Sequence, residues 1–403
     1  MMSSEVGRHH MQVAYWVYQL GDALNFSDDE KFEFVVAAAL HDIGAFSLKE
    51  RMAILEFEDT RPGEHARAGS FILAGFKPFS SIARLVKYHH TPWRNGEGAF
   101  HNGDSVPIGS HLIHLADRVA VKISHKEPVL SQIQGICKAI SAQEGEMFVP
   151  EHVDALLKIA KREYVWLDAT SDSLVTILKR LIRSQTREFS MDQMVDFSRL
   201  ICRLIDFKSK FTAAHSSGVA AVAVALARMN GFTYNEHRII EIAAYLHDVG
   251  KLAIPSEILE KQDKLTDTEQ FVMHSHVYYT YQMLEPFEML MPLSDWASFH
   301  QERLNGTGYP FGLDASDLPD GARIMAVADV FTALTEDRPY RKGMDTQSAM
   351  KVLKSMVEKG ELDNDQVEMV FAHSETLNDI RNLAQKEAIS EYNSFQTKLN
   401  HQL

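Results

Sequence analysis

The sequence predicts an all-α protein made of two tandem helical domains related by an internal repeat. Apolar residues recur at i, i+3, i+4 and i+7 in many segments of the 403-residue chain, whereas alternating strand patterns are scarce. Two similar series of histidines and aspartates also lie in the two halves of the chain. One duplicated helical domain accounts for both observations, because self-similarity along a chain indicates a repeated structural unit.

Helices are predicted in eight segments, which carry their apolar residues at helical spacing: 30–41, 66–75, 109–122, 151–163, 192–206, 215–229, 236–247 and 321–334. Pro and Gly cluster at 92–109 and 305–321, which predicts loops. The tail from 345 onward is predicted to be helical, with breaks near Gly360 and around Asn378. We therefore expect domains at 1–145 and 191–360, a helical connector at 146–190, and C-terminal helices at 361–403.

The repeat is defined by matching positions in each half. The first series is His9, His41-Asp42, His65, His89 and Asp117, with steps of 32, 24, 24 and 28 residues. The second series is His215, His247-Asp248, His276, His300 and Asp329, with steps of 32, 29, 24 and 29 residues. One such histidine alone would more often be structural. Recurrence of the whole set at similar spacing favours metal binding.

Composition excludes several classes of protein. The net charge of −14 disfavours binding to polymeric nucleic acid, which needs a basic surface. Two distant cysteines, Cys137 and Cys202, exclude a disulfide framework and a Cys-rich zinc finger. No signal peptide is visible, and the longest apolar run, 219–227, is about half of a membrane span. We expect a cytoplasmic protein without a membrane partner.

The residue types of the second series suit two divalent ions. Imidazole and carboxylate ligands bind Fe, Mn, Co, Ni or Zn. His247 and Asp248 end an apolar helix, where both side chains can point into one cavity and the carboxylate can bridge two ions. Two ions about 3.5–4 Å apart can stabilise the attacking and leaving oxygens of a phosphodiester. The pattern therefore indicates a hydrolytic two-metal site.

Two motifs in the second half give it a family resemblance. The segments 247–251 (His-Asp-Val-Gly-Lys) and 306–310 (Gly-Thr-Gly-Tyr-Pro) resemble the two signatures of HD-GYP phosphodiesterases. Further matches lie at 205–216, 327–331 and 337–341, so the resemblance covers about 195–355. It implies an HD-type all-helical fold and metal-dependent hydrolysis of a cyclic dinucleotide to a linear 5′-phosphorylated dinucleotide.

The resemblance also assigns site residues. The implied metal ligands are His215, His247, Asp248, His276, His300 and Asp329. The implied contacts with substrate phosphate or base are Lys251, Arg338 and Arg341, and Tyr309 is implied to line the substrate pocket. The resemblance makes Asp248 and Lys251 the catalytic pair. His274 is a candidate proton donor, with a surface histidine as the alternative.

Three positions depart from the family pattern. Phe211 stands in place of the usual Glu, Gln301 in place of the second histidine of a doublet, and Asn305 in place of Asp. Loss of the Glu and of one histidine argues for two ions rather than three, with Mn or Fe expected. Gln301 and Asn305 are also compatible with a changed base preference. Chains with tandem HD and HD-GYP domains and no receiver domain resemble a subgroup that acts on 3′3′-cyclic GMP-AMP. We therefore rank 3′3′-cyclic GMP-AMP slightly above cyclic di-GMP as the expected substrate.

The first half shows the opposite pattern. Its possible ligand set is fuller: Glu5, His9, His41, Asp42, His65, His89, His90 and Asp117. However, Ala45 stands where the lysine would be needed, and no Arg-Pro-Tyr-Arg motif follows Asp117. We interpret this half as a degenerate HD domain that packs on and regulates the second. An independent catalytic site is the alternative.

Two other functions remain open from the sequence. One is a cyclic-dinucleotide sensor without turnover, and the other is an HD-type mononucleotide phosphohydrolase. The terminal helix 381–398, with its amphipathic pattern, is also a candidate for homodimer formation.

Overall fold

The fold is helical, as a computed structural model shows for residues 4–45, 62–183, 187–208, 214–259, 261, 263–287, 292–337 and 342–401. One two-stranded antiparallel sheet lies in this part of the chain, with Phe100 opposite Ser105: β1 (Phe100–His101) and β2 (Asp104–Ser105). The predicted all-α class is therefore confirmed. By its internal contacts the chain divides into two compact units, Ser3–Glu188 and Phe189–Gln402.

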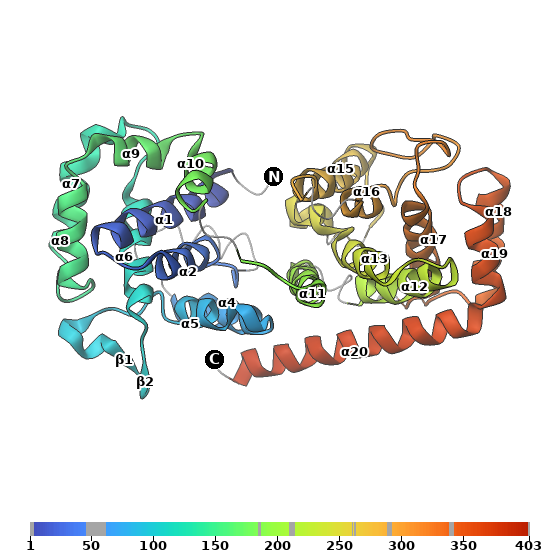
Figure 1. The fold of residues 1–403 in the computed structure, drawn as a ribbon, viewed down its shortest axis with the longest axis horizontal. Coiled ribbons are helices and arrows are strands. Elements are labelled where there is room, and N and C mark those ends of the chain that lie inside the picture. Colours follow the sequence, from blue (N-terminus) through green and yellow to red (C-terminus); the bar gives the residue numbers. More distant parts are fainter. Residues whose placement is uncertain are drawn as a thin grey trace. The chain divides into compact units, whose positions relative to one another are not determined.

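The first unit packs its helices around α1 (Figure 1). Its elements are α1 (Ser4–Ala23), α2 (Asp28–Ala39), α4 (Pro62–Ala74), η1 (Lys77–Phe79), α5 (Ser80–Lys87), η2 (Arg94–Ala99), α6 (Ile108–Lys122), α7 (Val129–Ser141), α8 (Pro150–Ile159), α9 (Glu163–Thr170) and α10 (Leu174–Leu181). Helix α2 begins at a capping box in which Ser27 and Glu30 satisfy each other's backbone N–H groups. The spacing analysis did not predict α1.

The segment treated as a connector packs into the first core. Trp166 of α9 is fully buried, lies 4.7 Å from Trp16 of α1 between ring centroids, and donates its indole N–H to Ala160. Leu174 and Leu178 of α10 belong to the same core. The single helix predicted at 151–163 is wrong, because α8 ends at Ile159 and α9 begins at Glu163.

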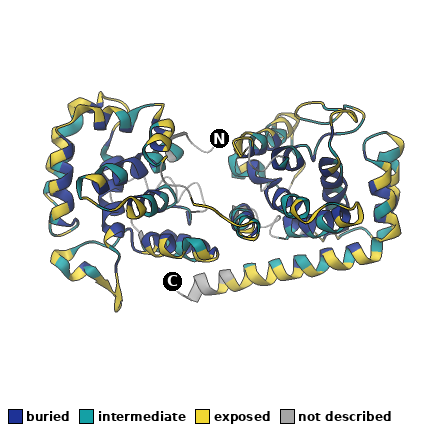
Figure 2. Cartoon of the chain, in the orientation of Figure 1, coloured by how far each residue is buried: buried dark blue, intermediate teal, exposed yellow. Residues whose placement is uncertain are grey.

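The second unit is built around α12. Its elements are α11 (Met191–Lys208), α12 (His215–Met229), α13 (Tyr234–Leu246), η3 (Val249–Ala253), α14 (Ser256–Leu259), α15 (Asp267–Leu284), α16 (Leu293–Ser298), α17 (Asp320–Thr335), α18 (Thr346–Glu358), α19 (Asn364–Ala372) and α20 (Ser374–His401). Small residues of α12 such as Ala220 and Ala223 are buried, which lets α13, α17 and α20 pack closely against it. Figure 2 shows the buried residues on the inward faces of these helices.

The tail matches its prediction in part. A break occurs at Gly360, which has a φ of +71° between α18 and α19. The break expected around Asn378 is wrong: α19 ends at Ala372, and α20 runs without interruption through Asn378.

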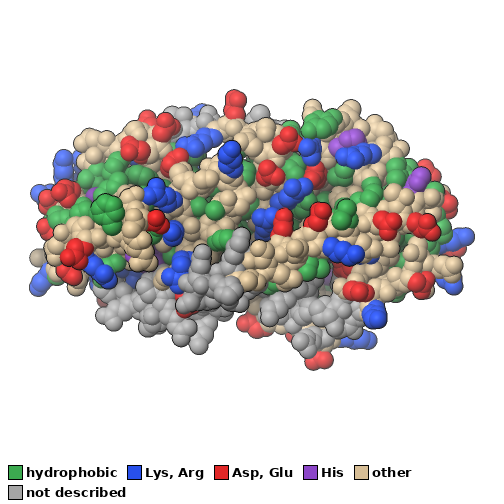
Figure 3. All heavy atoms as spheres, turned by 90° about the horizontal axis from the view of Figure 1, so that it is seen from below, with side chains coloured by type: hydrophobic (Ala, Val, Ile, Leu, Met, Phe, Trp, Pro, Cys, Tyr) green, Lys and Arg blue, Asp and Glu red, His purple; other side chains and the backbone are tan. Residues whose placement is uncertain are grey.

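Two surface properties bear on possible partners. Within the described residues, no helix is both long and apolar enough to cross a membrane. On the face seen in Figure 3, acidic and basic side chains are interspersed over the described part of the chain.

Candidate metal centres

Six predicted ligands converge in the second unit from separate elements. His215 begins α12, His247 and Asp248 link α13 to η3, and the others lie on α15, after α16 and on α17. All six are at most 9% exposed: His215, His247, Asp248, His276, His300 and Asp329. The structure therefore brings together, in one buried cluster, residues that are up to 114 positions apart.

The ligand atoms of this cluster lie close enough to share ions. Two groups have ligand atoms within 4.8 Å of one another: His215 with His247 and Asp329, and His247 with Asp248 and His300. Nε2 of His276 lies 3.3 Å from Asp248 Oδ1. The two groups adjoin at His247, whose Nε2 can bind one ion, and Asp248 supplies a carboxylate that can bridge to a second ion.

Hydrogen bonds fix the orientation of three of these imidazoles. Each donates Nδ1–H to the carbonyl oxygen three residues earlier, and a carbonyl can only accept, so Nε2 carries the lone pair that faces the cluster. The pairs are His247 with Ala244, His276 with Met273 and His300 with Ala297, at 2.7, 2.6 and 2.8 Å. Nε2 of His300 is buried and has no hydrogen-bond partner in the described part of the chain. A divalent transition metal fits this donor set and would satisfy that atom.

The surroundings of the cluster keep Asp248 and His300 in their metal-binding forms. Burial alone would raise the pKa of Asp248, but Lys251 and His247 outweigh it and hold that pKa well below its usual range. Nζ of Lys251 lies 2.6 Å from Asp248 Oδ2. Burial lowers the pKa of His300 to about 3, so this imidazole is neutral near pH 7.

His215 is held by a residue that the sequence analysis missed. Its Nδ1 lies 3.0 Å from Oε2 of Glu336, which is 5% exposed, and its Nε2 lies 3.0 Å from Asp329 Oδ1. Burial alone would lower the pKa of His215, but these two carboxylates raise it to about 10. The available sequence signal was an acidic residue just after the helix that carries Asp329.

A second missed residue organises the Gly-Tyr-Pro loop. Glu302 is 1% exposed and accepts hydrogen bonds from the backbone N–H groups of Phe311 at 2.8 Å and Leu313 at 3.1 Å. These bonds compensate for burial of the carboxylate and fix the loop beside the metal cluster.

The predicted substrate residues lie in different settings. Gln301 donates to Asp329 Oδ2 at 3.3 Å. Tyr309 stacks face to face on His274, with ring centroids 3.9 Å apart, and burial raises its pKa to about 12. Asn305 is exposed and bonds within its own loop, to Thr307, and to the Lys359 carbonyl. Arg338 and Arg341 lie outside the described residues.

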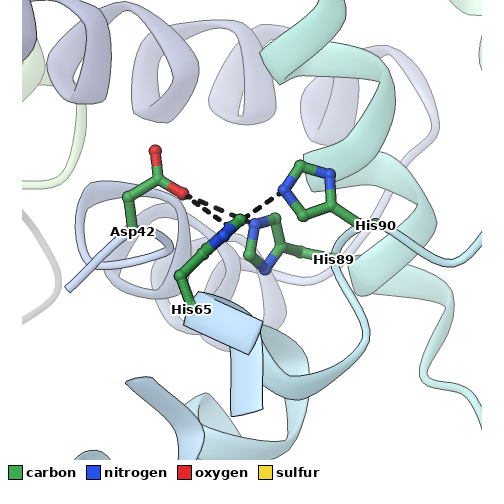
Figure 4. A group of neighbouring side chains, drawn as sticks. All are labelled: Asp42, His65, His89 and His90. Carbon is green, nitrogen blue, oxygen red and sulfur yellow. Dashed lines mark hydrogen bonds and ion pairs between the residues drawn. The ribbon is translucent and has the colours of Figure 1, made fainter. Parts of the chain in front are cut away.

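The first unit also gathers its predicted ligands, and it includes one more. Figure 4 shows Asp42, His65, His89 and His90 facing one another, with Nε2 of His65 3.3 Å from Asp42 Oδ1 and 3.0 Å from His90 Nε2. Two further groups with ligand atoms within 4.8 Å extend the cluster: His9 with His41 and Asp117, and His10 with His41 and Asp42. His10 was not predicted. Glu5 lies in α1, but its side chain is outside the described part of the structure.

An arginine distinguishes the first cluster from the second. Arg118 is 3% exposed, and its Nη2 and Nε lie 2.7 and 3.1 Å from Oδ2 of Asp117. One carboxylate oxygen is thereby engaged, while Oδ1 lies 3.2 Å from His9 Nε2. At the matching position the second unit has Val330, and the first unit has buried Ala45 in place of Lys251.

Comparison with known proteins places both clusters in one kind of domain. Residues 6–122 and residues 199–365 each match a family model described as HD domain. The 3′3′-cGAMP-specific phosphodiesterase 1 of Vibrio cholerae is 27% identical over 379 residues, which cover 91% of this chain and 87% of that protein. The 3′3′-cGAMP-specific phosphodiesterase 3 of the same organism is 32% identical, over 56% of this chain and 53% of its own length.

Two further comparisons extend this result. The cyclic di-GMP phosphodiesterase response regulator RpfG of Xanthomonas campestris is 36% identical over 46% of this chain and 49% of its own length. The crystal structure of a V. cholerae cyclic GMP-AMP-specific phosphodiesterase, V-cGAP3, aligns with a TM-score of 0.57 at 19% identity. That alignment covers 95% of this chain and 92% of that one, and supports the same fold.

Proposed function

The chain belongs to the HD-domain family, with one such domain in each half, and on that premise we propose that its second domain hydrolyses a cyclic dinucleotide. The observation that carries the proposal is Lys251, whose ammonium lies 2.6 Å from Asp248 at the edge of the buried ligand cluster. A fixed positive charge beside a metal centre suits a phosphodiester, because negative charge grows on the phosphoryl oxygens during displacement. The relatives named above are phosphodiesterases for this class of substrate.

We rank 3′3′-cyclic GMP-AMP slightly above cyclic di-GMP as the substrate. Support comes from the Vibrio cholerae relative that matches 91% of this chain, which is a 3′3′-cGAMP-specific phosphodiesterase. The product is a linear 5′-phosphorylated dinucleotide: the oxygen of water bonds to phosphorus, the bond from phosphorus to the 3′ oxygen breaks, and that oxygen leaves as a hydroxyl group.

The six buried ligands of the second domain would hold two divalent ions, Mn or Fe. Bound ions of this kind supply Lewis-acid stabilisation and a nucleophile at neutral pH. Lys251, held 2.6 Å from Asp248, would place its positive charge beside a phosphoryl oxygen. Tyr309 keeps its proton and lines the substrate pocket, where Gln301 and Asn305 contribute to base preference. Arg338 and Arg341 contact phosphate or base, a role for which guanidinium geometry is suited.

The first domain binds metal without turning over substrate in this proposal. Its histidines supply ligands, but Ala45 offers no ammonium and Arg118 engages one oxygen of Asp117. We assign it a regulatory role towards the second domain.

Matched aspartate variants test the proposal. Purified chain is incubated with Mn²⁺ or, anaerobically, with Fe²⁺, and is given both cyclic dinucleotides side by side. Asp248→Asn should abolish linear product, whereas Asp42→Asn, the same change in the first domain, should retain it. Hydrolysis by Asp248→Asn at the unmutated rate contradicts the proposal, and loss only in Asp42→Asn would move catalysis to the first domain. Tight binding of a cyclic dinucleotide without product would favour a sensor without turnover. A panel of mononucleotide substrates tests the alternative of an HD-type mononucleotide phosphohydrolase.

A further inference from the structure

The terminal helix α20 reaches the metal cluster of the second domain through buried side chains. Gln385 and Arg381 lie one helical turn apart on α20 and are 8% and 4% exposed. Nε2 of Gln385 donates to Glu336 Oε2 at 3.0 Å, and the same carboxylate oxygen lies 3.0 Å from Nδ1 of His215. A continuous hydrogen-bonded path therefore joins α20 to a metal ligand at the start of α12.

His215 depends on this path because of its place in the fold. The other three histidine ligands donate Nδ1–H to a carbonyl of the preceding turn. His215 is the first residue of α12, where the helix has no earlier turn of its own to offer a carbonyl. Its ring is oriented instead by Glu336, so the position of that carboxylate sets the direction in which Nε2 of His215 points.

Gln385 has one orientation that satisfies both of its neighbours. A carboxylate only accepts hydrogen bonds and a guanidinium only donates them. The amide Nε2 therefore faces Glu336, while Oε1 accepts from Nη1 of Arg381 at 2.5 Å. The buried carboxylate needs such donors, because an uncompensated charge in the interior is costly.

Helix α12 is shaped to receive this side chain. A Cβ at Gly218 would lie 2.8 Å from Nε2 of Gln385 and 3.1 Å from its Cδ and Cγ. The missing side chain lets the amide lie directly against α12, one turn from His215. Leu377, in the first turn of α20, is fully buried in the core of the same domain and anchors the helix.

We propose that Gln385 is a positioning residue for His215, through which α20 sets the geometry of the metal centre. This rests on the proposed function, because it takes His215 as a ligand of a divalent ion. Removing the amide donor weakens the hold on the Glu336 carboxylate and lets the His215 ring shift relative to the cluster.

A pair of isosteric variants tests the role. Gln385→Met keeps the length of the side chain and removes its donor. Gln366→Met is the matched control: Gln366 is 7% exposed and exchanges two amide hydrogen bonds with Asn230 at the far end of α12. Both variants should lose similar thermal stability. Only Gln385→Met should weaken Mn²⁺ affinity, by about tenfold, the effect typical of outer partners of metal ligands.

A second readout uses the metal-free chain. The imidazole resonances of His215, assigned with His215→Gln, should shift in Gln385→Met and stay in place in Gln366→Met. Unchanged resonances and Mn²⁺ affinity in folded Gln385→Met would overturn the positioning role. Absence of Mn²⁺ binding by the unmutated chain would instead contradict the proposed function, and the resonances would still decide whether Gln385 orients His215.

Discussion

Replacing Gly250 by alanine should displace the metal ligands of the second domain. A Cβ at this position would lie 1.9 Å from the carbonyl oxygen of His276 and 2.7 Å from the backbone nitrogen of Thr280. Contacts of this kind are essentially never below 3.0 Å, so η3 and α15 must separate by about 1.1 Å. The Gly250 N–H also donates to the Thr280 hydroxyl at 3.0 Å, and that bond would be strained.

This movement acts directly on the cluster. Asp248 lies two residues before Gly250, and its Oδ1 is 3.3 Å from Nε2 of His276 on the opposite element. A misplacement of about 1 Å costs about 100-fold in rate, and overpacking costs about 1–3 kcal/mol of stability. Steady-state hydrolysis, Mn²⁺ titration and urea unfolding measure the three effects.

Two further glycines serve as controls. Gly135 is exposed on α7, and a Cβ there meets nothing within 4 Å, so Gly135→Ala should leave the rate unchanged and raise stability by up to about 1 kcal/mol. Gly44→Ala, with its Cβ 2.2 Å from the His65 carbonyl oxygen, should disturb only the first cluster. Wild-type rate and Mn²⁺ affinity in Gly250→Ala would refute the reasoning.

Three other outcomes are expected. Lys251→Met should lower kcat/KM by about 100-fold while Mn²⁺ still binds, because the ammonium acts on the phosphate; an unchanged kcat/KM would remove Lys251 from catalysis. Burial lowers the pKa of His152 to about 4, below the unfolded value of 6.5. The first unit should therefore lose up to about 3 kcal/mol as pH falls from 6.5 to 4, because unfolding takes up a proton in that range, and urea titrations of His152→Gln should show a smaller loss. Trp166→Ala should destabilise the first unit by about 3–5 kcal/mol, measured by urea unfolding. An unchanged free energy of unfolding would mean that α9 does not depend on its packing against α1.

The ligands were predictable because their spacing recurs and their chemistry is distinctive. His247 and Asp248 stand at a helix end that the apolar period also identified, and α12 runs from His215 to Met229 as expected. Helix α1 was missed because its middle has no polar face. Val13 to Val17 are all at most 1% exposed, and a helix buried on every side has no amphipathic period.

The residues that hold the ligands in place were not predictable from the local sequence pattern. Glu336 contacts His215 across 121 positions, and Gln385 contacts Glu336 across 49. Neither Glu336 nor Gln385 stands at a regular sequence spacing from the residue that it contacts, so a single sequence does not reveal these pairs. Arg118 follows Asp117 directly, but only the packed structure shows that its guanidinium points inward onto the carboxylate rather than outward to water.

The most direct test of the account follows product formation as metal is restored. The chain is stripped with chelator and given increasing Mn²⁺, and linear dinucleotide from 3′3′-cyclic GMP-AMP is measured for the unmutated protein and for Asp42→Asn. We predict no product without metal and a return of activity in both proteins as Mn²⁺ binds. Hydrolysis that persists in the stripped chain, or that fails to return in folded, Mn²⁺-loaded protein, would contradict a metal-dependent site in the second domain.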